Sequence, residues 1–194
     1  MKALIAMRLR ESADMLLRIV SDAGLMAEIE QVAKRAIAAF KAGNKILLAG
    51  NGGSAADAQH IAGEFVNRFL FDRPALPALA LSTDTSVLTA IGNDSGFERV
   101  FERQVEANGF AGDVFFGFTT SGRSSNILRA MAACKKRGIV TVAFTGAAGL
   151  GSPKACDHCI RVPAKETPRI QEAHCVIGHV LCELIEAALF KRQP

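Results

Sequence analysis

The sequence contains no tryptophan and no tyrosine, and its 12 phenylalanines lie mostly in apolar runs. Exposed aromatic rings on which nucleic-acid bases stack are therefore scarce. The formal net charge of +4 is spread along the chain, without a cluster of lysines and arginines. A nucleic-acid-binding surface needs such a cluster, so the composition argues against a nucleic-acid partner.

Long hydrophobic runs are also missing, although apolar residues make up 49% of the chain. No stretch reaches the roughly 18 consecutive apolar residues that a membrane-spanning helix requires. The N-terminus begins with a lysine and apolar residues, as a signal peptide does. However, Arg8, Arg10 and Glu11 interrupt it and no cleavage site follows. We interpret it as an amphipathic helix and expect no membrane partner.

The five cysteines are an odd number and lack the spacing of a secreted disulfide framework. Reduced thiols in the cytoplasm fit this pattern best. Cys156 and Cys159 form a lone C-x-x-C that runs directly into a strand-like segment. A zinc or redox site normally has a second pair, or a helix that begins behind the first cysteine. We predict that these two thiols pack rather than carry chemistry.

The hydrophobic pattern predicts a single α/β domain over residues 1–194. Helical spacing predicts two helices at 1–24 and 26–42, and a last helix at about 169–190. Short apolar runs predict strands at 45–50, 76–82, 113–120, 139–146 and 158–163. Near-continuous apolar strands that alternate with helices are typical of a parallel sheet covered on both faces. We expect a three-layer α/β/α fold with a five-stranded, doubly wound, flavodoxin-like sheet, in which helices at 1–42 precede an α/β core at 45–192.

A glycine-rich turn follows the first predicted strand. Gly50, Gly52 and Ala55 match the pattern G-x-G-x-x-[GA] of dinucleotide sites. Such a site also needs an acidic residue at the end of the second strand, but Asp72 precedes that strand and Asp84 lies beyond it. A mononucleotide P-loop would need a lysine, which the turn lacks.

The turn therefore favours a simpler role, which is to present the backbone N–H groups of a helix N-terminus to an anion. Ser54 is predicted as the N-cap of that helix, with Asp57 as its capping-box partner. An ordinary strand-to-helix turn is the alternative.

A second polar turn, at residues 119–126, follows the third strand and reads TTSGRSSN. Its hydroxyls surround a glycine and lead into another helix, which makes a cradle suited to a phosphate monoester. Ligands of open parallel sheets bind at the carboxyl ends of the strands, where both turns lie. A small phosphorylated ligand with many hydroxyls, such as a sugar phosphate, fits two such turns.

His60 and Glu64 are four residues apart, so they share one face of the helix that the glycine turn opens. A solvated surface pair is the alternative. Since the helix begins at the anion turn, we expect the pair to project near the ligand.

Four stretches together resemble the sugar isomerase (SIS) domain family, in the branch that isomerises sedoheptulose 7-phosphate. They are GNGGSAADAQHIAGEF (50–65), AIGNDSGFERVF (90–101), GDVFFGFTTSGRSSNIL (112–128) and RIQEAHCVIGHVLCELIE (169–186). The resemblance runs from about residue 25 to the C-terminus. It implies a homotetramer with active sites at subunit interfaces. It also implies interconversion of D-sedoheptulose 7-phosphate and D-glycero-D-manno-heptose 7-phosphate through an enediol, the first step toward nucleotide-activated heptose for lipopolysaccharide core or capsule.

The resemblance also implies roles for individual residues. Glu64 and His179 would be catalytic, and one Zn²⁺ per subunit would be held by His60, Glu64, Gln171 and His179. The substrate would be bound by Asn51, Gly52, Gly53, Ser54, Glu64, Asn93, Asp94, Thr119, Thr120, Ser121, Ser124 and Gln171. Where this chain has Thr119, the family usually has serine.

Three questions stay open at this point. Gln171 and His179 are about 12 Å apart along one helix, so one metal could take both only with long reaches or from different subunits. Gln171 with His174 is the alternative pair. Glu64 could serve as base, as metal ligand, or as both. A non-catalytic SIS protein that binds the bacterial replication initiator is the alternative function, although such proteins lack the full His/Glu/Gln/His set.

Overall fold

Five short parallel strands form the central sheet, in the order β2-β1-β3-β4-β5. The computed structural model describes residues 1–191. The strands are β1 (Ile46–Ala49), β2 (Ala78–Ala80), β3 (Val114–Phe118), β4 (Val140–Thr145) and β5 (His158–Arg161). The helices are α1 (Lys2–Ser21), α2 (Ala23–Lys41), α3 (Gly53–Val66), α4 (Thr85–Ser95), α5 (Val100–Asn108), α6 (Ser125–Lys136) and α7 (Thr167–Leu189), with 3₁₀ turns at Phe97–Arg99 and Pro153–Ala155.

Both faces of the sheet are buried, as the apolar strands predicted. In β1, Ile46 and Leu48 point into one core and Leu47 and Ala49 into the other. This alternation follows from the two-residue period of a strand. The predicted three-layer fold is therefore confirmed, and the strand order is that of a flavodoxin-like sheet.

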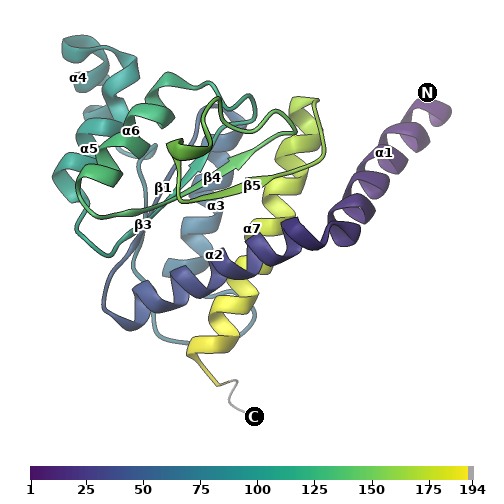
Figure 1. Cartoon of the computed structure of the whole chain (residues 1–194), viewed down its shortest axis with the longest axis horizontal. Helices are drawn as coiled ribbons and strands as arrows, with labels where there is room; N and C mark the ends of the chain where they lie inside the picture. The colour runs from purple at the N-terminus through teal and green to yellow at the C-terminus, as the bar shows by residue number, and fades with distance from the viewer. Residues whose placement is uncertain (192–194) are drawn as a thin grey trace.

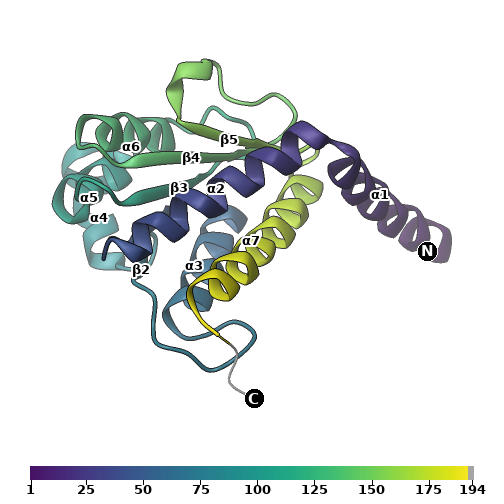
Figure 2. The same ribbon diagram turned by 60° about the horizontal axis from the view of Figure 1, so that its bottom comes forward.

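The helices divide between the two faces of the sheet (Figure 1). Helices α2, α3 and α7 share one core with the sheet, and α5 and α6 share the other. Figure 2 shows α3 and α7 running alongside each other on the same side of the sheet as α2. Helix α1 projects away from the body of the domain in both views.

Some boundaries differ from those that the sequence predicts. The first two helices meet at Asp22, whose carboxylate accepts a hydrogen bond from the backbone N–H of Leu25. The segment between β2 and β3 contains two helices and a 3₁₀ turn. The predicted core limit at residue 192 lies outside the described residues, and the domain limits remain a prediction. Within residues 1–191, no helix combines the length and apolar character needed to cross a membrane.

Candidate active site

In the glycine turn between β1 and α3, the backbone at Gly50 passes close to the backbone at Ser54. A side chain at Gly50 would collide with the carbonyl oxygen of Ser54. Gly52 has a φ of +56°, a left-handed conformation that favours glycine. These two positions therefore require glycine for the turn to form.

The prediction that Ser54 caps α3 is wrong. Because Gly52 takes up the left-handed conformation, the helix begins at Gly53 and Gly52 is its N-cap, without a side-chain cap. Ser54 lies buried in the first turn, where Gln171 Nε2 is 3.5 Å from its Oγ. Asp57 caps nothing, and its Oδ2 is buried without a hydrogen-bond partner among the described residues.

The hydroxyl turn between β3 and α6 contains both buried and exposed hydroxyl side chains. Thr119 is buried, and its Oγ1 lies 2.9 Å from Ser124 Oγ, so it orients that serine. Ser121 is exposed and accepts a hydrogen bond from the backbone N–H of Arg123. Gly122 has a φ of +67°, and a side chain there would collide with the carbonyl of Gly149.

The two turns are tied together at the carboxyl edge of the sheet. The side-chain amides of Asn51 and Asn126 exchange two hydrogen bonds, of 2.8 and 3.0 Å. On one side of this bridge lies a cavity of about 470 Å³, whose lining includes Gly50, Asn51 and Ser124.

A second cavity, of about 500 Å³, is lined in part by Thr120, Ser121 and Thr167. Arg123 and Lys165 also line it. Neither cation was predicted as a site residue, although Arg123 lies within the polar turn at residues 119–126. They add positive charge to the hydroxyl cradle.

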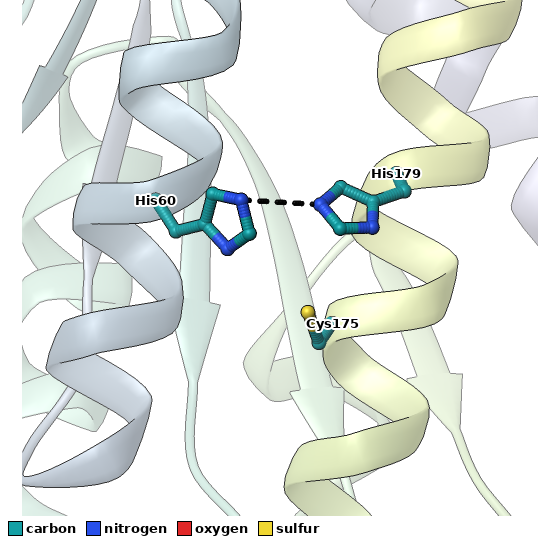
Figure 3. A group of neighbouring side chains, drawn as sticks. All are labelled: His60, Cys175 and His179. Atoms are coloured by element: carbon teal, nitrogen blue, oxygen red, sulfur yellow. Dashed lines mark hydrogen bonds between the residues drawn. The ribbon is translucent and has the colours of Figure 1, made fainter.

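Three of the predicted site residues converge where α3 and α7 pack together. His60 Nε2 lies 3.1 Å from Glu64 Oε1 and 3.2 Å from His179 Nε2. Figure 3 shows the two imidazoles facing each other across the gap between the helices. One chain therefore supplies His60, Glu64 and His179 together.

The convergence brings two imidazole nitrogens and one carboxylate oxygen within hydrogen-bond distance, an arrangement that a metal ion could also occupy. A single proton on His60 Nε2 serves one of its two contacts well and leaves the other lone pair without a donor. Nearby, burial raises the pKa of Asp57, although His60 opposes this rise. A divalent cation at the cluster would satisfy the facing lone pairs and offset the cost of the buried carboxylate.

Cys175 lies beside these histidines, although it was not among the predicted site residues. Its Sγ and one ring nitrogen of each of His60 and His179 all lie within 4.8 Å of one another, which is a group that could hold a metal ion. The available signal was its spacing, since it lies four residues from both Gln171 and His179 on one helix face.

The remaining histidines face elsewhere. His174 is fully buried between Phe118 and Phe144, and its Nε2 lies 3.3 Å from the carbonyl oxygen of Thr145. Burial lowers its pKa to about 4, so it is neutral at pH 7. His174 therefore faces away from the cluster of His60, Glu64 and His179. His158 contacts Glu28 through its Nδ1, at 3.2 Å.

Other predicted residues lie apart from the histidine cluster. The Gln171 amide lies against Gly53 and Ser54, at the opposite end of α3 from Glu64. Asn93 and Asp94 are exposed in the last turn of α4, where they hydrogen-bond to each other. Within residues 1–191, neither bonds to the glycine or hydroxyl turn.

Known proteins are similar to this chain in sequence and in fold. Residues 9–146 match the family model described as the SIS domain. The chain therefore belongs to the SIS domain family.

Individual relatives show to which branch of that family the chain is most similar. A phosphoheptose isomerase of Aneurinibacillus thermoaerophilus is 62% identical over 175 residues, which cover 90% of this chain and 88% of the relative. The solved phosphoheptose isomerase of Neisseria gonorrhoeae superposes with a TM-score of 0.86 at 40% identity, over 96% of this chain and 98% of that one. The enzyme of Francisella tularensis superposes with a TM-score of 0.87 at 35% identity, over 96% and 100%. Within the family the chain groups with the phosphoheptose isomerases, which are aldose–ketose isomerases of sugar phosphates.

Proposed function

We propose that this chain interconverts D-sedoheptulose 7-phosphate and D-glycero-D-manno-heptose 7-phosphate. The observation that carries the proposal is the convergence of Glu64, His60 and His179 on helices that start beside the phosphate-type turns. A non-catalytic binding protein of this fold would not need a carboxylate and two imidazoles within hydrogen-bond distance. The role as first step of nucleotide-activated heptose synthesis, for lipopolysaccharide core or capsule, rests on the resemblance.

The phosphate binds at the hydroxyl turn, between the cavity that Thr120, Ser121, Arg123 and Lys165 line and the neighbouring cavity that Ser124 lines. Hydroxyls give the phosphate oxygens hydrogen bonds with a fixed direction, and the two cations offset its charge. Thr119 acts indirectly, by holding the Ser124 hydroxyl. The sugar hydroxyls are bound by Asn51, by the N-terminus of α3, and by Asn93 and Asp94.

The chemistry is a proton transfer between C1 and C2 of the sugar. Glu64 removes the C1 proton of the ketose and returns it at C2 through an enediol, which is the work of a general base. His179 serves the substrate oxygens, either as an acid or as a ligand of a metal. His60 contacts both Glu64 and His179 and so holds these two side chains in position relative to each other.

The donors at the cluster fit a zinc ion, because imidazole, carboxylate and thiol groups are its usual protein ligands. When bound there, Zn²⁺ would supply a Lewis acid that stabilises negative charge on the substrate oxygens. The resemblance adds Gln171 of α7 to the ligands, and its side-chain amide packs against the first turn of α3.

Purified protein should convert sedoheptulose 7-phosphate to the aldose, as followed by NMR. Removal of the metal with a chelator should abolish the conversion, and added Zn²⁺ should restore it. Absence of conversion in a folded, zinc-loaded sample would favour the non-catalytic alternative.

The hydroxyl turn can be tested separately. Replacing Ser121 and Ser124 by alanine removes hydrogen bonds to a charged group, each worth about 1.5–3 kcal/mol. KM for the sugar phosphate should therefore rise well over tenfold, with the protein still folded. Ser21→Ala, on the surface of α1, is the control. An unchanged KM in the folded double variant would place the phosphate elsewhere.

The proposal includes assembly into a homotetramer through the N-terminal helices. Helix α1 projects from the domain and exposes a set of large apolar side chains: Leu4, Ile5, Met7, Leu9, Leu17 and Val20. A monomer would leave this surface in water, whereas copies of the chain can bury it against each other. Light scattering should give a tetramer mass at micromolar protein, and the variant Leu9→Asp/Leu17→Asp should dissociate. A stable wild-type monomer would contradict the proposal.

A further inference from the structure

Cys156 and Cys159 lie close together at the beginning of the edge strand β5. In a regular strand, residues three apart point to opposite faces of the sheet. Here the backbone bends at Asp157, just before the strand begins at His158. Both cysteines therefore pack in the core that α5 and α6 share with the sheet, and both are free thiols.

The bend is held by hydrogen bonds between Asp157 and Thr141 of β4. The Asp157 carboxylate accepts hydrogen bonds from the backbone N–H and the hydroxyl of Thr141, of 2.8 and 2.7 Å. The backbone N–H of Asp157 donates to the Thr141 hydroxyl in return, at 3.0 Å. These bonds fix the turn that brings the two sulfur atoms within hydrogen-bond reach of each other.

The Cys159 sulfur is the one that favours the thiolate form. It accepts a hydrogen bond from the Cys156 thiol and one from the backbone N–H of Leu150. The hydroxyl of Thr145 lies 3.7 Å away. These bonds, that from Cys156 above all, hold the pKa of Cys159 below its ordinary value, although burial and a nearby carboxylate oppose the shift. The thiolate is the nucleophilic form of cysteine, so Cys159 is the attacking sulfur of the pair.

The other cysteines of the chain are less reactive. Burial raises the pKa of Cys134 and of Cys182 to about 12, and it also raises the pKa of Cys175. Cys159 is only partly buried, on a strand at the edge of the sheet. An accessible thiolate with a second cysteine beside it is the usual arrangement of a redox-sensitive thiol pair.

The segment that contacts the Cys159 sulfur also forms part of the second cavity beside the hydroxyl turn. Gly149 and Gly151, on either side of Leu150, line this cavity of about 500 Å³. The carbonyl of Gly149 lies so close to Gly122 of the hydroxyl turn that a side chain at Gly122 would collide with it. A change in the contact between Leu150 and Cys159 therefore reaches the wall of the cavity through the backbone.

We propose that Cys156 and Cys159 are a reversible redox site, which hydrogen peroxide oxidises to a disulfide that weakens substrate binding. The Cys159 thiolate attacks one peroxide oxygen, the O–O bond breaks, and the hydroxide that leaves takes a proton from solvent. The Cys156 sulfur then attacks the Cys159 sulfenic acid, so that an S–S bond forms and the S–O bond breaks. The Cys156 proton leaves with that oxygen as a second water, and two electrons have passed from the thiols to the peroxide.

The disulfide takes the thiolate acceptor away from the N–H of Leu150 and so loosens the cavity wall. This effect on substrate binding rests on the proposed function, whereas the disulfide itself does not.

The test uses the full-length, reduced protein exposed to hydrogen peroxide. Trypsin cleaves after Lys154 and Arg161 and releases the peptide ACDHCIR, which holds both cysteines of the pair and no others. We expect this peptide to lose the mass of two hydrogen atoms, and dithiothreitol to restore it. In Cys156→Ser, the sulfenic acid trap dimedone should label Cys159, whereas in Cys159→Ser it should leave Cys156 unlabelled. Cys175→Ser is the matched control and should still form the disulfide.

The coupling to the cavity is tested on the same samples. Backbone amides of residues 147–151 should exchange with deuterated water faster in the disulfide form, because the segment loses a hydrogen bond. KM for sedoheptulose 7-phosphate should rise by roughly 2- to 10-fold, the effect of losing about one hydrogen bond, and should return on reduction. The double variant Cys156→Ser/Cys159→Ser should show neither response to peroxide.

Two results would overturn the proposal. One is an ACDHCIR peptide that stays reduced while another cysteine is oxidised. The other is a disulfide form whose amide exchange at 147–151 and KM match those of the reduced protein. Isomerase activity of the reduced protein is measured first, and its absence would refute the proposed function alone, because the disulfide and the amide exchange need no turnover.

Discussion

Replacing Glu64 by glutamine should lower turnover by roughly 10²- to 10⁴-fold, the usual contribution of one general base. Glutamine keeps the shape of the side chain and one oxygen near His60, but it cannot take up the C1 proton. Substrate affinity should change much less, because the phosphate turns are untouched. The measurement is exchange of the C1 proton into deuterated water by NMR, with zinc content determined on the same sample.

The outcome also separates a base from a metal ligand. If the Glu64→Gln variant keeps its zinc but loses exchange of the C1 proton, Glu64 is the base. Exchange at the wild-type rate with zinc retained would contradict that role. Loss of both would support a metal-binding role instead. Glu183→Gln, an exposed substitution on α7, is the control and should leave both quantities unchanged.

Replacing Arg73 by alanine should destabilise the fold by about 3–5 kcal/mol, because it leaves a buried charge without its partner. The side chains of Arg73 and Glu186 are only 2% and 1% exposed, and Arg73 Nε lies 2.9 Å from Glu186 Oε1. Glu186 also accepts hydrogen bonds from the backbone N–H groups of Phe69 and Leu70. The measurement is the urea midpoint at fixed protein concentration.

The matched control is Arg68→Ala, an exposed position on the same segment, which should stay within about 0.5 kcal/mol of the wild type. An effect below about 1 kcal/mol for Arg73→Ala would mean that the ion pair contributes little beyond what its desolvation costs.

The same pair should make stability depend on pH. Burial would raise the pKa of Glu186, but the N–H groups of Leu70 and Phe69 and the Arg73 guanidinium outweigh this and hold the pKa below its ordinary value. The ionised Glu186 carboxylate therefore stabilises the fold fully above the pKa of about 4.3 that a glutamate has in the unfolded chain. This stabilisation is lost as the pH falls through the lower pKa that Glu186 has in the folded protein. Glu186→Gln should flatten this part of the stability profile.

This ion pair also supports the active site. Arg73 donates hydrogen bonds to the backbone carbonyls of Glu64 and Phe65, near the C-terminal end of α3, where helix carbonyls lack partners within the helix. Glu186 accepts a hydrogen bond from the backbone N–H of Phe69, whose ring stacks on His179 at 5.5 Å between centroids. A single buried pair thus holds the segments that carry the proposed base and one imidazole.

Local sequence patterns determined the layers of the fold and the kind of site. Continuous apolar strands between helices specify a sheet buried on both faces, and the parallel arrangement places the glycine and hydroxyl turns at one edge. The four-residue spacing of His60 and Glu64 fixes them on one helix face. Each of these features depends on residues close together in the chain, so periodicity alone reveals it.

Only the tertiary structure decided which residues meet across α3 and α7. The rotation of α7 buries His174 and turns Cys175 and His179 toward His60, a choice made by packing along the whole helix. The start of α3 was set by the left-handed Gly52, so Ser54 became a buried contact of Gln171. The pairing of Arg73 with Glu186 spans 113 residues and became visible only in the folded chain. Contacts of this kind depend on how elements dock, and no local pattern in the sequence records that.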